Sequence, residues 1–142
     1  MSFIAPPAPI IVDASIAVGS AVGEEPALRA IVSWRDTDAM LLAPPLMWTE
    51  TANALVRGHR FSAADALRIL RTLRATGIES ADRGLDGLEG AIVLAERHRL
   101  SVYDATYLWL AIDVDGELAT LDRDLARAAE AEGVALAIPL GA

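Results

Sequence analysis

Short apolar runs alternate with stretches of helical periodicity along the chain, and this alternation limits the folds that it can adopt. Bounded apolar runs predict strands at 10–12, 39–43, 78–81, 117–122 and 134–138. Apolar residues at helical spacing predict helices at 24–35, 85–99, 101–112 and 123–133. Strands that alternate with helices favour a mostly parallel sheet with helices on both faces, which is a three-layer α/β/α fold.

A helical hairpin interrupts this alternation after the second predicted strand. Its arms are 47–60 (MWTETANALVRGHR) and 62–77 (SAADALRILRTLRATG). Ser62 is suited to cap the start of the second arm and Gly77 to cap its end. In the later helix 85–99, an apolar face is expected from Leu88, Ile92 and Ala95.

Length and composition indicate one globular domain over 1–142, with 1–9 as an N-terminal tail. The chain has 142 residues, of which 54% are hydrophobic, and this is enough to bury a core. Its longest apolar run, Ala105 to Ile112, is far shorter than the roughly 20 residues needed to cross a bilayer. There is no basic signal-peptide region, so we expect a cytoplasmic protein with no membrane contact.

The absence of Cys removes disulfides and thiolate metal sites, and the two His residues, His59 and His98, argue against structural zinc. The net charge of −8 argues against indiscriminate nucleic-acid binding. All the basic residues are Arg, and the stretch 57–74 holds five of them with the single acid Asp65. This stretch is either a solvated helical face or a binding surface for an anionic partner.

Acidic residues recur where strands end or where the next helix begins. These candidates are Asp13, Glu50, Asp104 and Asp122. Each has a structural explanation as well, because acids cap helices and favour their N-termini, and the pair Ser101 and Asp104 has capping-box spacing. Parallel strands, however, bring their carboxyl ends to one edge of the sheet, where α/β proteins form their sites.

Carboxylates gathered at such an edge would repel one another unless a cation were present. All-oxygen ligands select hard ions such as Mg²⁺ or Mn²⁺. Such ions can position a phosphodiester and activate water, and they would reconcile an acidic protein with a polyanionic substrate. The sequence argues against catalysis by a Ser or Cys nucleophile, because the chain has no Cys and no G-x-S-x-G motif.

The segments IIVDASIAV, TETANAL, LSVYDATYLWLA and LATLDRDLARAAEAEGV, in this order, resemble the PIN-domain ribonucleases, and within them the VapC-like toxins of toxin–antitoxin pairs. By this resemblance Asp13, Glu50, Asp104 and Asp122 match the catalytic acids. The supporting positions that it implies are Ser15, Asn53, Thr120 and, through the Arg stretch, Arg57, with Asp124 as a possible extra ligand.

The resemblance implies Mg²⁺-dependent hydrolysis of RNA without a covalent enzyme intermediate, with Mn²⁺ able to substitute. Asp13, Asp104 and Asp122 would hold the metal, and Glu50 would either complete the ligand set or orient the water. It also implies a homodimer and a VapB-like antitoxin whose C-terminal segment lies in a groove near the site, rimmed by arginines.

Three alternatives stay open on the sequence alone. A noncatalytic PIN-like module would bind RNA or protein without cutting it, and a housekeeping nuclease would process RNA without an antitoxin. A haloacid-dehalogenase-like phosphatase also begins with an Asp after its first strand, but it needs a second acid two residues later, where this chain has Ser15.

Overall fold

A computed structural model describes residues 6–138, so residues 1–5 of the predicted tail lie outside the described part. Its parallel sheet has the strand order β3-β2-β1-β4. The strands are β1 (Ile10–Val12), β2 (Leu41–Ala43), β3 (Glu79–Ser80) and β4 (Glu117–Ala119). Every residue of β1 is buried, because this strand is central and both of its faces are covered.

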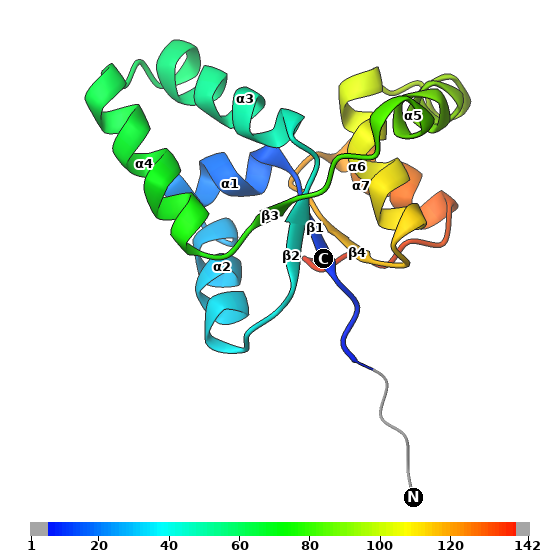
Figure 1. Ribbon diagram of the computed structural model, residues 1–142, viewed down its shortest axis with the longest axis horizontal. Coiled ribbons are helices and arrows are strands. Elements are labelled where there is room, and N and C mark those ends of the chain that lie inside the picture. The colour runs from blue at the N-terminus through cyan, green and yellow to red at the C-terminus, as the bar shows by residue number, and fades with distance from the viewer. Residues whose placement is uncertain (1–5, 139–142) are drawn as a thin grey trace, which may run out of the picture.

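Helices cover both faces of the sheet, which confirms the three-layer prediction (Figure 1). One group consists of α1 (Ala14–Ala21), α2 (Ala27–Asp36), α3 (Leu46–Asn53), the π-helix η1 (Ala54–Gly58) and α4 (Ala63–Ala75). The other group consists of α5 (Gly84–His98), α6 (Val102–Asp113) and α7 (Arg123–Ala131). Among residues 6–138, no helix is both long enough and apolar enough to cross a membrane.

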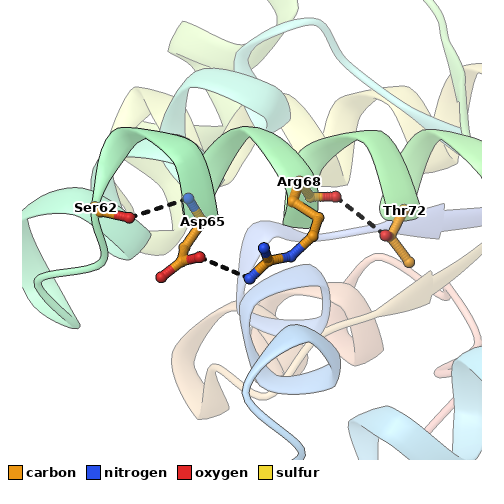
Figure 2. A network of polar contacts seen from close by, with 4 residues as sticks. All are labelled: Ser62, Asp65, Arg68 and Thr72. Atoms are coloured by element: carbon orange, nitrogen blue, oxygen red, sulfur yellow. Dashed lines mark hydrogen bonds and ion pairs between the residues drawn. The ribbon is translucent and has the colours of Figure 1, made fainter.

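The predicted helical hairpin is present as α3, η1 and α4. Ser62 caps α4 as expected, since its Oγ accepts a hydrogen bond of 3.1 Å from the Asp65 N–H, and Gly77 follows the C-cap with a φ of +92°. Figure 2 shows this cap, together with the 2.6 Å contact between Asp65 and Arg68. The first arm ends differently from the prediction, because η1 continues α3 with a π turn closed by the His59 N–H on the Ala54 carbonyl.

The structure differs from the sequence prediction in two elements, a strand that is absent and a helix that was not predicted. The apolar run 134–138 is not a strand: only Leu136 bridges to Leu118, and the two flanking hydrogen bonds both use the backbone of Leu118. Conversely, α1 was not predicted, because ASIAVGSA is small and apolar on all sides and has no amphipathic period. The helix directly after β1 therefore lies in the core rather than on the surface.

Of the apolar face expected on α5, only Ala95 is buried, and the prediction is wrong for Leu88 and Ile92. Leu88 and Ile92 are exposed, and the buried face of α5 is formed by Gly87, Ala91, Leu94 and Ala95. The cause is a close approach of α6: a Cβ at Gly90 would overlap the Trp109 ring. Gly87 and Gly90 thus lie against the Trp109 ring of α6, and the larger residues Leu88 and Ile92 are left outside.

Candidate active site

The sheet places the ends of two neighbouring strands side by side. β1 pairs with β4 through Val12 and Ala119, so Asp13 and Thr120 follow directly after paired residues. The Asp13 N–H continues the ladder by donating to the Ala119 carbonyl at 3.0 Å. This is the carboxyl edge of the sheet, where the sequence predicted a site.

Two hydroxyls hold one oxygen of the Asp13 carboxylate. Ser15 Oγ and Thr120 Oγ1 both donate to Asp13 Oδ2, at 2.7 and 2.6 Å. Each hydroxyl also accepts a backbone N–H from the segment after β4, from Leu121 at 2.9 Å and from Asp122 at 3.0 Å. The predicted supporting roles of Ser15 and Thr120 beside Asp13 thus have a geometric basis, and Oδ1 accepts no side-chain hydrogen bond within residues 6–138.

Asp13 is a buried acid that pairs with no cationic side chain in the part of the chain that the structure describes. Its exposed fraction is 5%, and no ion pair within the described residues includes it. Burial raises the pKa of Asp13, and nearby Asp122 raises it further, while the hydrogen bonds from Thr120, Ser15 and the Ala14 backbone lower it. The fold therefore holds this carboxyl at an electrostatic cost and offsets that cost with neutral donors.

Glu50, in α3, reaches the same neighbourhood and contacts a tyrosine that the sequence reasoning missed. The Tyr107 hydroxyl donates to Glu50 Oε1 at 2.6 Å. Burial raises the pKa of Glu50, Asp13 and Asp104 raise it further, and the Tyr107 hydrogen bond lowers it. Tyr107 lies three residues after Asp104, which places both on one face of α6, and that spacing was the available signal.

Asp104 and Asp122 lie at helix N-termini, as the capping interpretation predicts, and they also lie near the other acids. Ser101 caps α6 by accepting the Asp104 N–H at 3.0 Å, and Asp122 Oδ1 caps α7 by accepting from the N–H groups of Asp124 and Leu125. The pKa of Asp104 is nevertheless raised, first by burial and then by Asp13 and Asp122. Capping thus does not remove these two residues from the acidic neighbourhood.

The remaining predicted site residues lie further out. Asn53 is exposed at the end of α3, and Arg57 is exposed in η1. Asp124 is exposed and paired with Arg127 at 3.1 Å, although its charge still raises the pKa of Asp104. No side-chain hydrogen bond links any of these three residues to Asp13 in the described part of the chain.

The donor set suits a hard divalent cation, because it consists of carboxylate and hydroxyl oxygens. The pKa values of Asp13, Glu50 and Asp104 are all raised, chiefly by burial and further by neighbouring acids, and the charge of Asp122 contributes to the increase at Asp13 and Asp104. Within residues 6–138, however, no three His, Cys, Asp or Glu side chains converge as a ready metal site. Two of these carboxylates have one oxygen engaged elsewhere: Glu50 Oε1 accepts from Tyr107, and Asp122 Oδ1 caps α7.

Three comparisons with known proteins bear on this arrangement. Among solved structures, the chain is similar to PAE2754 from Pyrobaculum aerophilum, with 24% identity, a TM-score of 0.66, and coverage of 85% of this chain and 84% of the other. It is also similar to a toxin–antitoxin complex from Klebsiella pneumoniae, with 21% identity, a TM-score of 0.64, and coverage of 82% and 90%.

A third similar structure is VapC20 of Mycobacterium tuberculosis, described as a Sarcin-Ricin loop cleaving toxin, with 21% identity, a TM-score of 0.68, and coverage of 92% and 99%. At these identities the likeness shows the fold. No curated protein sequence matches the chain. The PIN domain family model matches residues 10–131, which include all four candidate acids, and the chain therefore belongs to the PIN domain family.

Proposed function

We propose that this protein is a cytoplasmic, divalent-metal-dependent endoribonuclease, and that it acts as the toxin of a toxin–antitoxin pair. The proposal rests mainly on the burial and the hydrogen-bond partners of Asp13. It is a buried carboxylate with no cationic partner in the described residues, held by two hydroxyls at the edge where three other acids gather. Structural acids are normally paired or solvated, and perturbed acids at such an edge are typical of functional sites.

Each residue has a defined task in this proposal. Asp13, Asp104 and Asp122 would hold Mg²⁺, which when bound supplies charge neutralisation for the phosphodiester and activation of water. Ser15 and Thr120 keep the Asp13 carboxylate in one orientation. Glu50, at the same edge, either adds a ligand oxygen or orients the attacking water by a hydrogen bond.

The decisive experiment is cleavage of single-stranded and looped RNA by the purified protein, free of antitoxin, in Mg²⁺, in Mn²⁺ and in excess EDTA. We expect cleavage with either ion and none with EDTA. The Asp13→Asn variant, purified in parallel, controls for contaminating nucleases. Equal cleavage by wild type and this variant would remove the assignment.

An antitoxin partner is supported by an apolar groove on the face away from α5. The groove has a volume of about 290 Å³ and lies between α1, α2 and α4. Its apolar lining comes from Leu28, Ile31, Val32, Ile69 and Leu73, with Arg35 and Arg68 at the same groove. An amphipathic antitoxin segment with acidic flanks would match this combination of apolar floor and basic side chains.

A homodimer is supported by the opposite side of the molecule. The outward residues of α5 form an apolar surface in which Leu85 is 75% exposed and Val93 is 55% exposed, with Leu88 and Ile92 beside them. A patch of this kind on a helix favours contact with another chain. Analytical ultracentrifugation of the wild type and of an Ile92→Glu variant would test it, and we expect a dimer that the charge dissociates.

The noncatalytic alternative keeps one observation in its favour, namely that no three acids in residues 6–138 converge as metal ligands. The cleavage assay above separates it from the nuclease. A housekeeping nuclease differs from a toxin in the cell: expression of a toxin arrests growth, and co-expression of its antitoxin restores it. A neighbouring reading frame for a small DNA-binding protein would supply that antitoxin.

A further inference from the structure

We propose that Tyr107 is the positioning residue for Glu50: its buried hydroxyl fixes Glu50 Oε1, so that one orientation of the carboxylate is presented at the acidic edge. The inference rests on the proposed nuclease function and adds to it a residue outside the acidic set. It is carried by the 2.6 Å hydrogen bond between two residues that are 57 positions apart in the chain.

The contact joins two elements that the fold brings together at the site. Tyr107 is fully buried in α6, and Glu50 projects from α3 on the other side of the sheet. Asp104 lies one turn before Tyr107 on the same helix. A single rigid helix therefore carries both an acid of the site and the group that orients a second acid, which fixes the two relative to each other.

The hydroxyl, rather than the ring, is the part of Tyr107 that needs Glu50. The ring packs in the core, where a phenylalanine would fill the same space. A buried hydroxyl without a partner is unfavourable, and Glu50 is its one side-chain partner in residues 6–138. Burial and the carboxylate raise the pKa of Tyr107, so the group remains an O–H donor throughout the neutral range.

Glu50 has reason to move if the donor is removed. It is partly buried, lies near Asp13 and Asp104, and has no cationic partner in the described residues. Repulsion from these acids favours rotamers that carry the carboxylate away from the edge, and the glutamate side chain has several such rotamers. The phenol is the contact that opposes this rotation.

The first test reads orientation without activity. Crystal structures of the wild type and of Tyr107→Phe, both without metal, would be compared at Glu50. We expect one carboxylate orientation in the wild type, with Oε1 on the phenol, and two or more in the variant. A single unchanged orientation in Tyr107→Phe would overturn the proposal, because the carboxylate would then be fixed by something else.

The second test is a double-mutant cycle in RNA cleavage with Tyr107→Phe and Glu50→Ala. Outer partners of ligating groups typically contribute about 10–100-fold, so we expect Tyr107→Phe to lower kcat about tenfold with little change in KM. In the Glu50→Ala background the same substitution should have no further effect. An equal loss in both backgrounds would mark Tyr107 as merely structural and contradict the inference.

Tyr103→Phe is the matched control, since Tyr103 is exposed in the same helix and its hydroxyl has no hydrogen bond within residues 6–138. It should leave cleavage unchanged, and melting curves should show that both Phe variants fold. If the wild type cleaves no RNA, the proposed function fails, and the crystallographic comparison still decides the role of Tyr107.

Discussion

Two sets of carboxylates in this protein are treated in opposite ways. Glu132, just after α7, lies 2.9 Å from Arg97 Nη1 and 2.6 Å from His98 Nε2, and these partners, His98 first, lower its pKa. Asp13, Glu50 and Asp104 have raised pKa values, chiefly through burial, and no ion pair in the described residues. One carboxylate ties the end of α5 to the end of α7, whereas the others are left with unbalanced charge.

The difference separates an acid that serves the architecture from acids that do not. Arg97 and His98 were available within the chain to neutralise a carboxylate, and the fold uses them at Glu132. At the sheet edge it supplies only neutral donors, such as Ser15 and Thr120. An arrangement that withholds cations from buried acids is suited to receive a cation from outside.

The largest effect that would test this comparison is expected for Asp13→Asn. Cleavage of RNA should fall by more than about a hundredfold, since even outer partners of ligating groups contribute 10–100-fold. The melting temperature in EDTA should stay equal or rise, because the substitution removes a buried charge while keeping an acceptor for both hydroxyls. Initial rates and thermal melts measure the two halves. A large drop in the melting temperature without metal would show that Asp13 stabilises the fold, as Glu132 does, and would contradict the prediction.

Mg²⁺ should stabilise the protein through the same acids. A ligand at one hundred times its Kd adds about 2.7 kcal/mol to the free energy of unfolding. We expect Mg²⁺ to raise the melting temperature of the wild type, and to raise it less in Asp13→Asn and in Asp104→Asn. Glu132→Gln serves as the control with an intact site. Identical shifts in all four proteins would show that the acids share no ion.

Glu132→Gln should have the reverse profile of Asp13→Asn. It weakens the contacts with Arg97 and His98, which should lower the free energy of unfolding by about 1 kcal/mol, a value reduced for solvent screening. RNA cleavage below the melting transition should be unchanged. Urea unfolding gives the stability and initial rates give the activity. Loss of activity in the folded variant would break the division between the two sets.

The pH dependence of stability should differ in sign between the sets. Asp13 has a pKa in the folded protein above its ordinary value of 3.8. Its contribution to the free energy of unfolding is therefore complete below pH 3.8 and is lost as the pH rises through the folded pKa. Glu132 has a folded pKa below 4.5, so its contribution is present above 4.5 and is lost as pH falls through the folded pKa. Urea unfolding in EDTA from pH 3 to 8, with Asp13→Asn and Glu132→Gln as references, should give differences that slope in opposite directions.

The smallest effect is expected for the arginines of the hairpin's first arm, and it tests whether they bind RNA phosphates. Arg57 and Arg60 are exposed, and no ion pair in residues 6–138 includes either. Replacing both with Ala, on an Asp104→Asn background that keeps RNA intact, should weaken binding and flatten its salt dependence by roughly one unit of slope per lost phosphate contact.

Arg29→Ala is the control for the arginine test, because Arg29 lies on α2 and pairs with Glu25. An unchanged salt slope in the double variant would identify the Arg stretch as a solvated face. In that case neither Arg57 nor Arg60 would contribute to RNA binding.

Much of the fold followed from local patterns in the sequence. The apolar run before Asp13 and the cap at Ser62 are determined by neighbouring residues, so the strand β1 and the start of α4 could be predicted. The outward face of α5 could not, because it depends on how closely Trp109 approaches Gly90, a contact between distant residues. The failed strand at 134–138 has the same origin, since strand pairing depends on a partner that local sequence does not specify.

The candidate site could be predicted as a set of residues, which stays a prediction, but its contacts could not be predicted. The position of Asp13 at a strand end could be read from the chain. The predicted strand 117–122 runs three residues past the end of β4, so the place of Thr120 directly after the strand was not predicted, and only the adjacency of β1 and β4 shows it beside Asp13. The contact of Tyr107 with Glu50 was not predicted, because a tyrosine in an apolar helix has the same pattern as a core residue. Only its hydrogen bond to Glu50, which lies in a different helix, distinguishes it.

The π turn of η1 has a consequence for how the gene for this protein can change. The wide turn from Ala54 to His59 holds one residue more than an α-helical turn, so loss of a single codon there would close it to α geometry. The neighbouring residues would keep their facing, and the arm would shorten by about 1.5 Å. Leu55 is buried in this turn and Arg57 is exposed, so the codon that is lost would be that of an exposed residue such as Arg57. In this arm of the hairpin, loss of one residue would be less damaging than the same loss inside the regular helix α4, where every later residue would turn to a new face.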